Sequence, residues 1–327
     1  MKRWIYETLH PEIYHGHDRR PPYFEGWYYR LINAAEDQRY AIIPGIFLGA
    51  KGHAFIQVLE GHTRRTAYHT FPVEQFHADR QHFEVRVGES VFTRQGLQLA
   101  LDRPEPLGQI HGSLQLQGGQ PWPVRWHAPG IMGWYAWLPW MECYHGVLSF
   151  DHAISGALEV EGQQHVFDGG RGYIEKDWGK AFPAGYIWFQ SNHFDTPNVC
   201  LTASIAMIPW LGSAFRGFII GLWLDGRLHR FATYTGARTE HLALADQQVD
   251  WVVSDRRLRL EMQAVQAGGG LIYGPTHHDM GRRVDETLDA LLEVRLSERS
   301  GRVLFEGRGR HAGLEINGDI PRLLAAR

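Results

Sequence analysis

Short segments rich in β-branched and aromatic residues recur along this chain, and Gly, Asn and Asp separate them. Examples are RYAIIPGIFLG and HAFIQVLEG in the first half, and YIWFQSNHF and GFIIGLWLDG in the second. Apolar and polar residues alternate in several of these segments, as in strands with one buried face. The pattern predicts an antiparallel, almost all-β protein. Helical spacing is scarce, and its best candidate, ETLDALLEVRL at residues 286–296, fits a strand equally well in its second half.

The two halves of the chain echo each other. GWYYRLIN (26–33) shares its leading Gly, two aromatic positions and closing Asn with GYIWFQSN (185–192), and LEGHTRRTAYHT (59–70) resembles LDGRLHRFATYT (224–235). We interpret this as an internal duplication that gives two β-domains, residues 1–175 and 176–327, which meet near residues 165–185. Chance similarity between two β-rich halves is the alternative. We expect lipocalin-like barrels or closed sandwiches, because closure removes exposed strand edges.

Composition excludes several functional classes. The net charge of −3 gives no basic field for nucleic acid, and two cysteines form neither a disulfide framework nor a CxxC metal clip. Residues 1–22 lack the apolar stretch of a secretory signal. The most apolar windows, 131–140 and 215–224, are too short for a spanning helix of roughly 20 residues. We therefore expect a cytoplasmic, soluble protein, at most peripherally attached to a membrane.

Chemistry is suggested most strongly by GGRGYIEKDWGKAFPAGYIWFQSNHF at 169–194. In an extended segment, Glu175 and Asp177 point to one face and Lys176 to the other. Two buried carboxylates on one face repel, so one tends to stay protonated and can act as a general acid beside Trp178. The alternative is a solvated charged turn in which Lys176 pairs with a neighbour. Glu25 similarly lies among aromatic residues in YFEGWYYRLIN (23–33).

Metal binding is not expected. His lies beside Asp in HGHDRR (15–20) and THHDM (276–280), but a stable site needs three or four converging ligands. MECYHGVLSFDH (141–152) favours a structural role for His145 or His152. Nucleophile-elbow and nucleotide-binding motifs are absent, so we expect no cofactor.

These residues resemble a known family. HDRRPPYFEGWYYRL resembles the N-terminal motif of the tocopherol cyclase family, and YIEKDWGKAFPAGYIWFQSNHF resembles its second motif, an E-K-N-W-G run followed by F-P and a W-x-Q-x-N strand. A weaker match covers GPTHHDMG and GRVLFEGRGRHAGLEING. Asp177 stands where the plant enzymes have Asn. The resemblance implies two lipocalin-like β-domains and closure of a chromanol ring from a prenylated quinol, without metal or redox cofactor.

The resemblance also implies the site. The candidate acids are Glu175, Asp177 and Glu25. The faces of Trp27, Tyr28, Trp178 and Trp188 would stabilise a carbocation, and Lys176, Gln190 and Asn192 would complete the substrate site. In the alternative, Glu25 and Glu175 are structural and accept hydrogen bonds from Trp, Tyr or Lys176. The second functional hypothesis is a lipocalin-like carrier of a lipophilic ligand, which needs no buried acid.

Overall fold

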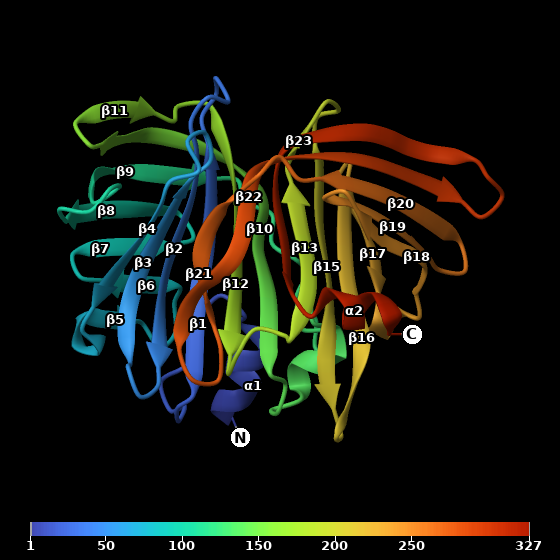
Figure 1. Cartoon of the computed structure of the whole chain (residues 1–327), viewed down its shortest axis with the longest axis horizontal. Coiled ribbons are helices and arrows are strands. Elements are labelled where there is room, and N and C mark those ends of the chain that lie inside the picture. Colours follow the sequence, from blue (N-terminus) through green and yellow to red (C-terminus); the bar gives the residue numbers. More distant parts are fainter. Residues whose placement is uncertain (1, 327) are drawn as a thin grey trace. The chain divides into compact units, whose positions relative to one another are not determined.

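A computed structural model describes residues 2–326, and antiparallel strands dominate it (Figure 1). About 61% of residues lie in strands and 8% in helices, well above the usual 20–25% strand content. The all-β prediction is therefore confirmed. None of the helices within residues 2–326 is long and apolar enough to cross a membrane.

The chain divides into two compact units. The first contains residues 1–182 and 271–283, and the second contains residues 183–270 and 284–327. The chain first passes from one unit to the other after Phe182, and strand β12 (Gly170–Gly179) lies wholly in the first unit. Residues 271–283, from the second half of the sequence, also belong to the first unit. The sequence alone gave no sign of this.

The first unit begins with helix α1 (Lys2–Leu9) and contains a sheet of twelve strands. Along the sheet the order is β4-β3-β2-β1-β12-β10-β9-β8-β7-β6-β5, and β11 pairs with β10. The strands are β1 (Tyr23–Ile32), β2 (Arg39–Leu48), β3 (His53–Glu60), β4 (Thr66–Phe71), β5 (Phe76–Ala78), β6 (Glu84–Val87), β7 (Ser90–Thr93), β8 (Gly96–Asp102), β9 (Gln109–Gln117), β10 (Cys143–Val160), β11 (Gln163–Val166) and β12. Short 3₁₀ helices follow β4 (η1, Val73–Gln75) and β9 (η2, Gly133–Trp137).

The second sheet has eleven strands in the order β17-β16-β15-β13-β23-β22-β20-β19-β18, with β14 paired to β23 and β21 paired to β22. The strands are β13 (Gly185–Ser191), β14 (His193–Phe194), β15 (Val199–Trp210), β16 (Ser213–Leu224), β17 (Arg227–Ala232), β18 (Arg238–Ala245), β19 (Gln248–Ser254), β20 (Leu258–Val265), β21 (Gly270–Pro275), β22 (Met280–Glu298) and β23 (Val303–Gly318). The 3₁₀ helix η3 (Thr233–Thr235) follows β17, and helix α2 (Ile320–Ala325) follows β23.

The strand orders of the two sheets correspond. In the first sheet β1 pairs with β2 on one side and with β12 on the other. In the second sheet β13 likewise pairs with β15 and with β23. The sequence echoes fall on equivalent places: 26–33 and 185–192 lie on β1 and β13, and 59–70 and 224–235 span the β3–β4 and β16–β17 turns. This correspondence is what an internal duplication predicts.

Neither sheet closes into a barrel, which corrects the expectation of closed domains. The strand path of the first sheet has free ends at β4 and β5, and that of the second at β17 and β18. In both, a 3₁₀ helix connects the two end strands. Pro72 precedes η1 and cannot donate a ladder hydrogen bond, and Gly236 follows η3 in the left-handed region at φ 79°. These turns redirect the chain where a closing pair would form.

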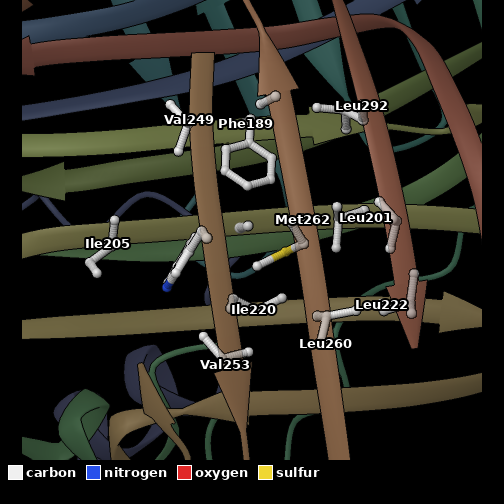
Figure 2. Packing of buried hydrophobic residues seen from close by; sticks show 14 of the residues in the cluster. Phe189, Leu201, Ile205, Ile220, Leu222, Val249, Val253, Leu260, Met262 and Leu292 are labelled. Atoms are coloured by element: carbon white, nitrogen blue, oxygen red, sulfur yellow. The ribbon is translucent and has the colours of Figure 1, made fainter. Parts of the chain in front are cut away.

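Apolar side chains fill the interior of the second unit. Figure 2 shows Phe189, Leu201, Ile220, Met262 and Leu292 pointing toward one another from β13, β15, β16, β20 and β22. Alternate residues of each strand take part, as the two-residue period requires. The other faces of the same strands therefore carry the polar and aromatic groups.

Residues 286–296, the best helical candidate, are part of β22. Ala290, Leu292, Val294 and Leu296 are buried and alternate with exposed residues. Pairing with β20 and β23 on both sides supplies the backbone hydrogen bonds that a helix would have made internally. Tertiary pairing thus overrides the helical propensity of this segment.

Leu291 and Leu292 provide a matched test of this packing. Leu292 is 1% exposed in the core, whereas its neighbour Leu291 is 58% exposed. We expect Leu292→Ala to lower the free energy of unfolding by about 2–5 kcal/mol, and Leu291→Ala to change it by less than about 0.5 kcal/mol. Urea unfolding of the two variants measures the difference. Equal losses would show that residues 286–296 are not a two-faced strand.

Candidate active site

The centre of the first unit is the strand trio β1, β12 and β10, and its two faces carry different groups. Residues directly opposite one another in antiparallel strands share a face. Successive residues of β12 therefore alternate between two sets of neighbours. The opposed pairs are Glu25–Trp178, Trp27–Lys176 and Gly146–Lys176 on one face, and Tyr28–Glu175 and His145–Asp177 on the other.

On the first of these faces, Lys176 and Glu25 form an ion pair that is fully removed from solvent. The Lys176 Nζ lies 2.6 Å from Glu25 Oε1, and both side chains are 0% exposed. The Tyr23 hydroxyl donates to Glu25 Oε2, and the His15 backbone N–H donates to both carboxylate oxygens at 3.1 and 2.9 Å. A buried ion pair persists only when its remaining hydrogen-bonding groups are also satisfied, and these contacts satisfy the carboxylate.

The same lysine fixes the segment that precedes β1. Its Nζ donates to the carbonyl oxygens of Pro11, at 2.9 Å, and of Ile13, and it lies 2.8 Å from His15 Nδ1. Trp27 reinforces this link, because its indole N–H donates to the Glu12 carbonyl at 3.1 Å. Residues 11–15 are thereby held against the sheet by one buried cation.

This environment argues against Glu25 as a proton donor. Burial alone would raise the pKa of Glu25, but the charge of Lys176 and the hydrogen bond and charge of His15 bring it below its ordinary value. Burial and the charge of Lys176 also lower the pKa of His15, which favours a neutral ring. Glu25 is therefore a carboxylate held by a lysine, as in the structural alternative for this residue.

Two of the tryptophans expected to stabilise a carbocation already contact a cation. The Lys176 Nζ lies 5.0 Å from the ring centroid of Trp27 and 4.5 Å from that of Trp178. Trp27 also stacks on Phe83 at 5.9 Å, and Trp178 stacks on His15 at 4.5 Å. These rings and Lys176 therefore form a packed cation–π assembly rather than an open substrate cage.

The opposite face brings together His145, Glu175 and Asp177. His145 Nδ1 lies 2.9 Å from Asp177 Oδ1, and its Nε2 lies 3.5 Å from Glu175 Oε2. The Tyr173 hydroxyl donates to the same Glu175 oxygen at 2.6 Å. Glu175 is buried, at 5% exposure, and Asp177 is partly buried. We call these four residues the carboxylate cluster.

His145 is the cation of the carboxylate cluster. Burial works to lower its pKa, but the charges of Asp177 and Glu175 and the hydrogen bond to Asp177 raise it to about 9. The ring is therefore an imidazolium at neutral pH. This cation lies between two acidic side chains on one face of the sheet.

The potential metal-ligand atoms of His145, Glu175 and Asp177 lie within 4.8 Å of one another. Asp177 contacts Nδ1 and Glu175 contacts Nε2, so the carboxylates lie at different nitrogens of one ring. A metal centre would need both carboxylates to converge with a single ring nitrogen. The arrangement is that of an ion triad in which histidine bridges two carboxylates.

A small pocket reaches this region from the side of α1. Its cavity volume is ≈ 30 Å³, enough for water but not for a prenylated ring. Helix α1 contributes Trp4, Glu7 and Thr8 to the lining. Tyr144, His145 and Trp178 contribute from β10 and β12. His145 is thus the member of the carboxylate cluster that borders the pocket.

In the second unit, the expected substrate residues Trp188 and Gln190 lie on the face of β13 opposite Phe189 and the apolar core, and Asn192 follows the end of the strand. All three are buried. Trp188 lies directly opposite Glu315 of β23, whose Oε2 accepts a hydrogen bond from Tyr186 at 2.6 Å.

Several of these groups escaped the sequence interpretation. Tyr173 and Glu175 are two residues apart, so they share a face of β12. The sequence YIEKD could therefore have predicted that the tyrosine lies beside the acid. His145 had been interpreted as structural, and it meets Asp177 only through the pairing of β10 with β12. In the second unit, Glu286 lies opposite Glu315 on β22 and β23, a pairing that no short motif indicates.

The buried ion pair yields a stability prediction. Lys176→Met would leave Glu25 buried without its counter-ion, so we expect unfolding free energy to fall by about 3–5 kcal/mol. The double variant with Glu25→Gln should lose less than the sum of the two single changes. Arg308→Met, which breaks the exposed Arg308–Glu293 pair, should cost no more than about 1 kcal/mol. Chemical denaturation measures all four; a small loss for Lys176→Met would contradict the proposed anchoring role.

His145 yields a pH prediction. Its pKa is about 9 in the folded protein and about 6.5 when unfolded. The stabilisation is therefore fully present below pH ~6.5 and is lost as the pH rises toward ~9, with a magnitude on the order of 3 kcal/mol. Urea unfolding at several pH values should show this decline in the parent protein and a flatter profile in His145→Gln. A parallel decline in both would assign the effect to other groups.

Known proteins share this fold and parts of this sequence. The crystal structure of CghA with Sch210972 covers 91% of this chain and 89% of its own, with a TM-score of 0.56 and 12% identity, which shows a shared fold. A probable chloroplastic tocopherol cyclase of Oryza sativa subsp. japonica is 30% identical over 108 residues, or 32% of this chain and 23% of that protein. The chloroplastic tocopherol cyclase of Zea mays is 24% identical over 199 residues, or 57% and 41%.

The matched regions thus span less than half the length of these plant relatives. The family model described as tocopherol cyclase-like matches residues 109–318, which include His145, the β12 carboxylates and the β13 strand. This match covers well over half of the chain. The chain belongs to the tocopherol cyclase-like family.

Proposed function

We propose that this protein is an acid-catalysed cyclase that closes a ring on a prenylated quinol or phenol. The observation that carries the proposal is the carboxylate cluster: two acids, an imidazolium and a tyrosine on one face of β10 and β12. Membership of the tocopherol cyclase-like family supports the reaction class. An acid held in a water-poor environment is what protonation of an alkene requires.

Glu175 is the acid in this proposal. The His145 imidazolium is closer to Asp177, at 2.9 Å, than to Glu175, at 3.5 Å, so Asp177 is the better-compensated carboxylate. Glu175 is also the more buried of the two. Since burial and a neighbouring negative charge both favour the neutral form of a carboxyl group, we assign the catalytic proton to Glu175.

The proposed reaction conserves protons. Glu175 transfers its proton to one carbon of the tail alkene, and the electron pair of the alkene forms the new C–H bond. The phenolic oxygen then adds to the tertiary cation, and the phenolic proton returns to the Glu175 carboxylate. The product is an isomer of the substrate. Tyr28, opposite Glu175 on the same face, is the ring that we assign to stabilising the cation.

His145 and Tyr173 are positioning residues in this scheme. The His145 ring holds one Asp177 oxygen, and the Tyr173 hydroxyl fixes one Glu175 oxygen. Neither group needs to exchange a proton with the substrate. A carrier of lipophilic ligands, the other function considered, would not need this arrangement.

Conservative amide variants test the acid. We expect Glu175→Gln to lower turnover by about 10²–10⁴ while changing stability little, because a neutral carboxyl and an amide have similar hydrogen-bonding needs. The assay is incubation with a panel of prenylated quinols, followed by mass and retention analysis, since cyclisation keeps the mass and changes the retention. Asp177→Asn should retain more activity than Glu175→Gln, and the double variant should be inactive but folded.

Glu159→Gln is the matched control, because Glu159 is an exposed carboxylate on β10, far along the strand from His145. It should keep full turnover. Full activity in Glu175→Gln would rule out Glu175 as the acid. Early unfolding of that variant would instead indicate a charged, structural Glu175.

A further inference from the structure

Exposed tryptophans gather at one end of the first unit. Trp4 on α1 is 37% exposed, and Trp126, Trp134 and Trp140, between β9 and β10, are 64%, 44% and 58% exposed. Among the described residues, these are the tryptophans in the exposed class. Single exposed apolar residues are ordinary on a soluble protein, but a concentrated set is not. We call these four residues the tryptophan surface.

The tryptophan surface is ordered by contacts beneath it. The Trp137 ring lies 5.2 Å from Trp4 and 4.8 Å from Trp126, and its indole N–H donates to the Trp126 carbonyl at 2.9 Å. Trp134 stacks on Tyr135 at 4.1 Å. These contacts join α1 to the segment around η2, which lie at the same end of the first unit (Figure 1). The exposed rings are thus presented by a packed support.

The charge around these rings is also unusual. Residues 118–141 contain no Asp, Glu or Lys and a single Arg, Arg125, which is exposed between Val124 and Trp126. Helix α1 adds Lys2 at its exposed start, whereas Arg3 pairs with Glu7 and Asp18. A surface with aromatic rings, few charges and no acid on its longer segment matches the headgroup region of a bilayer, where amphipathic Trp rings concentrate.

We propose that the tryptophan surface docks this protein onto a lipid bilayer. The rings enter the headgroup region with their indole N–H groups near water, and Arg125 and Lys2 face the phosphates. No span of the bilayer is involved, so binding is reversible. Because most of the contact is apolar, binding should persist at high salt, where purely electrostatic attachment would be screened.

This surface adjoins the pocket described above. Trp4 lines the pocket, together with Met132 and Ala136 from the same segment as Trp134, and the pocket borders His145. A lipophilic substrate resident in the bilayer would therefore reach the protein at this end. This part of the inference rests on the proposed function, whereas docking itself does not.

Vesicle binding tests the docking. Co-sedimentation with phosphatidylcholine vesicles, with and without phosphatidylglycerol, should capture the parent protein. The triple variant Trp126→Ala, Trp134→Ala, Trp140→Ala should bind at least about tenfold more weakly. The matched control is Val166→Ala, Leu211→Ala, Leu291→Ala, which removes three exposed apolar side chains elsewhere and should bind like the parent. Thermal unfolding verifies that both triple variants fold, and single Trp140→Glu provides a second reduction in binding without a cavity.

Activity then separates docking from chemistry. With a prenylated quinol embedded in vesicles, the tryptophan variant should lose at least about tenfold in rate, and with the same quinol in detergent micelles it should match the parent. Glu175→Gln should still bind vesicles normally. Vesicle binding therefore tests the docking proposal even if the cyclase proposal fails.

Three outcomes would overturn the docking proposal: no vesicle binding by the parent, equal binding by the tryptophan variant, or equal loss in the control variant. A parent that ignores vesicles but forms a dimer that the tryptophan variant dissolves would assign the surface to self-association instead.

Discussion

The buried Lys176–Glu25 pair is the interaction on which the rest of the first unit depends. Breaking one partner of such a pair leaves a charge in a low-dielectric interior, which costs far more than an exposed pair contributes. Lys176 lies on β12 and Glu25 on β1, and the same ammonium group holds the carbonyls of Pro11 and Ile13. The position of residues 11–15, and the entry of α1 beside the pocket, follow from this one cation.

The two-residue period of β12 separates structural and chemical roles. Lys176 points to the anchored face, and Glu175 and Asp177 point to the other, where β10 supplies His145. The buried cation and the proposed acid are therefore sequence neighbours on opposite sides of one strand. This separation leaves His145 as the cation that contacts the carboxylates.

Apolar packing explains where the chemistry is placed. The interior of the second unit is filled by side chains such as Phe189, Trp251 and Met262, and Trp27 packs on Phe83 in the first. The sheets are open, and the carboxylate cluster lies on the face opposite the packed Lys176–Glu25 pair. The two units are similar scaffolds, and within residues 2–326 the triad of His145, Glu175 and Asp177 belongs to the first.

The sequence by itself determined the β class and the alternation that puts Glu175 and Asp177 on one face, because both depend on a local period of two residues, and its two echoing segments indicated the duplication. Only the tertiary structure decided that residues 286–296 form a strand, that Glu25 is an ionised anchor, and that His145 completes the carboxylate cluster. Each of these depends on which distant strand lies alongside, and pairing across more than a hundred residues, as between Glu25 and Lys176, leaves no short-range pattern. Burial then sets the charge of each group, and burial is a property of the folded chain.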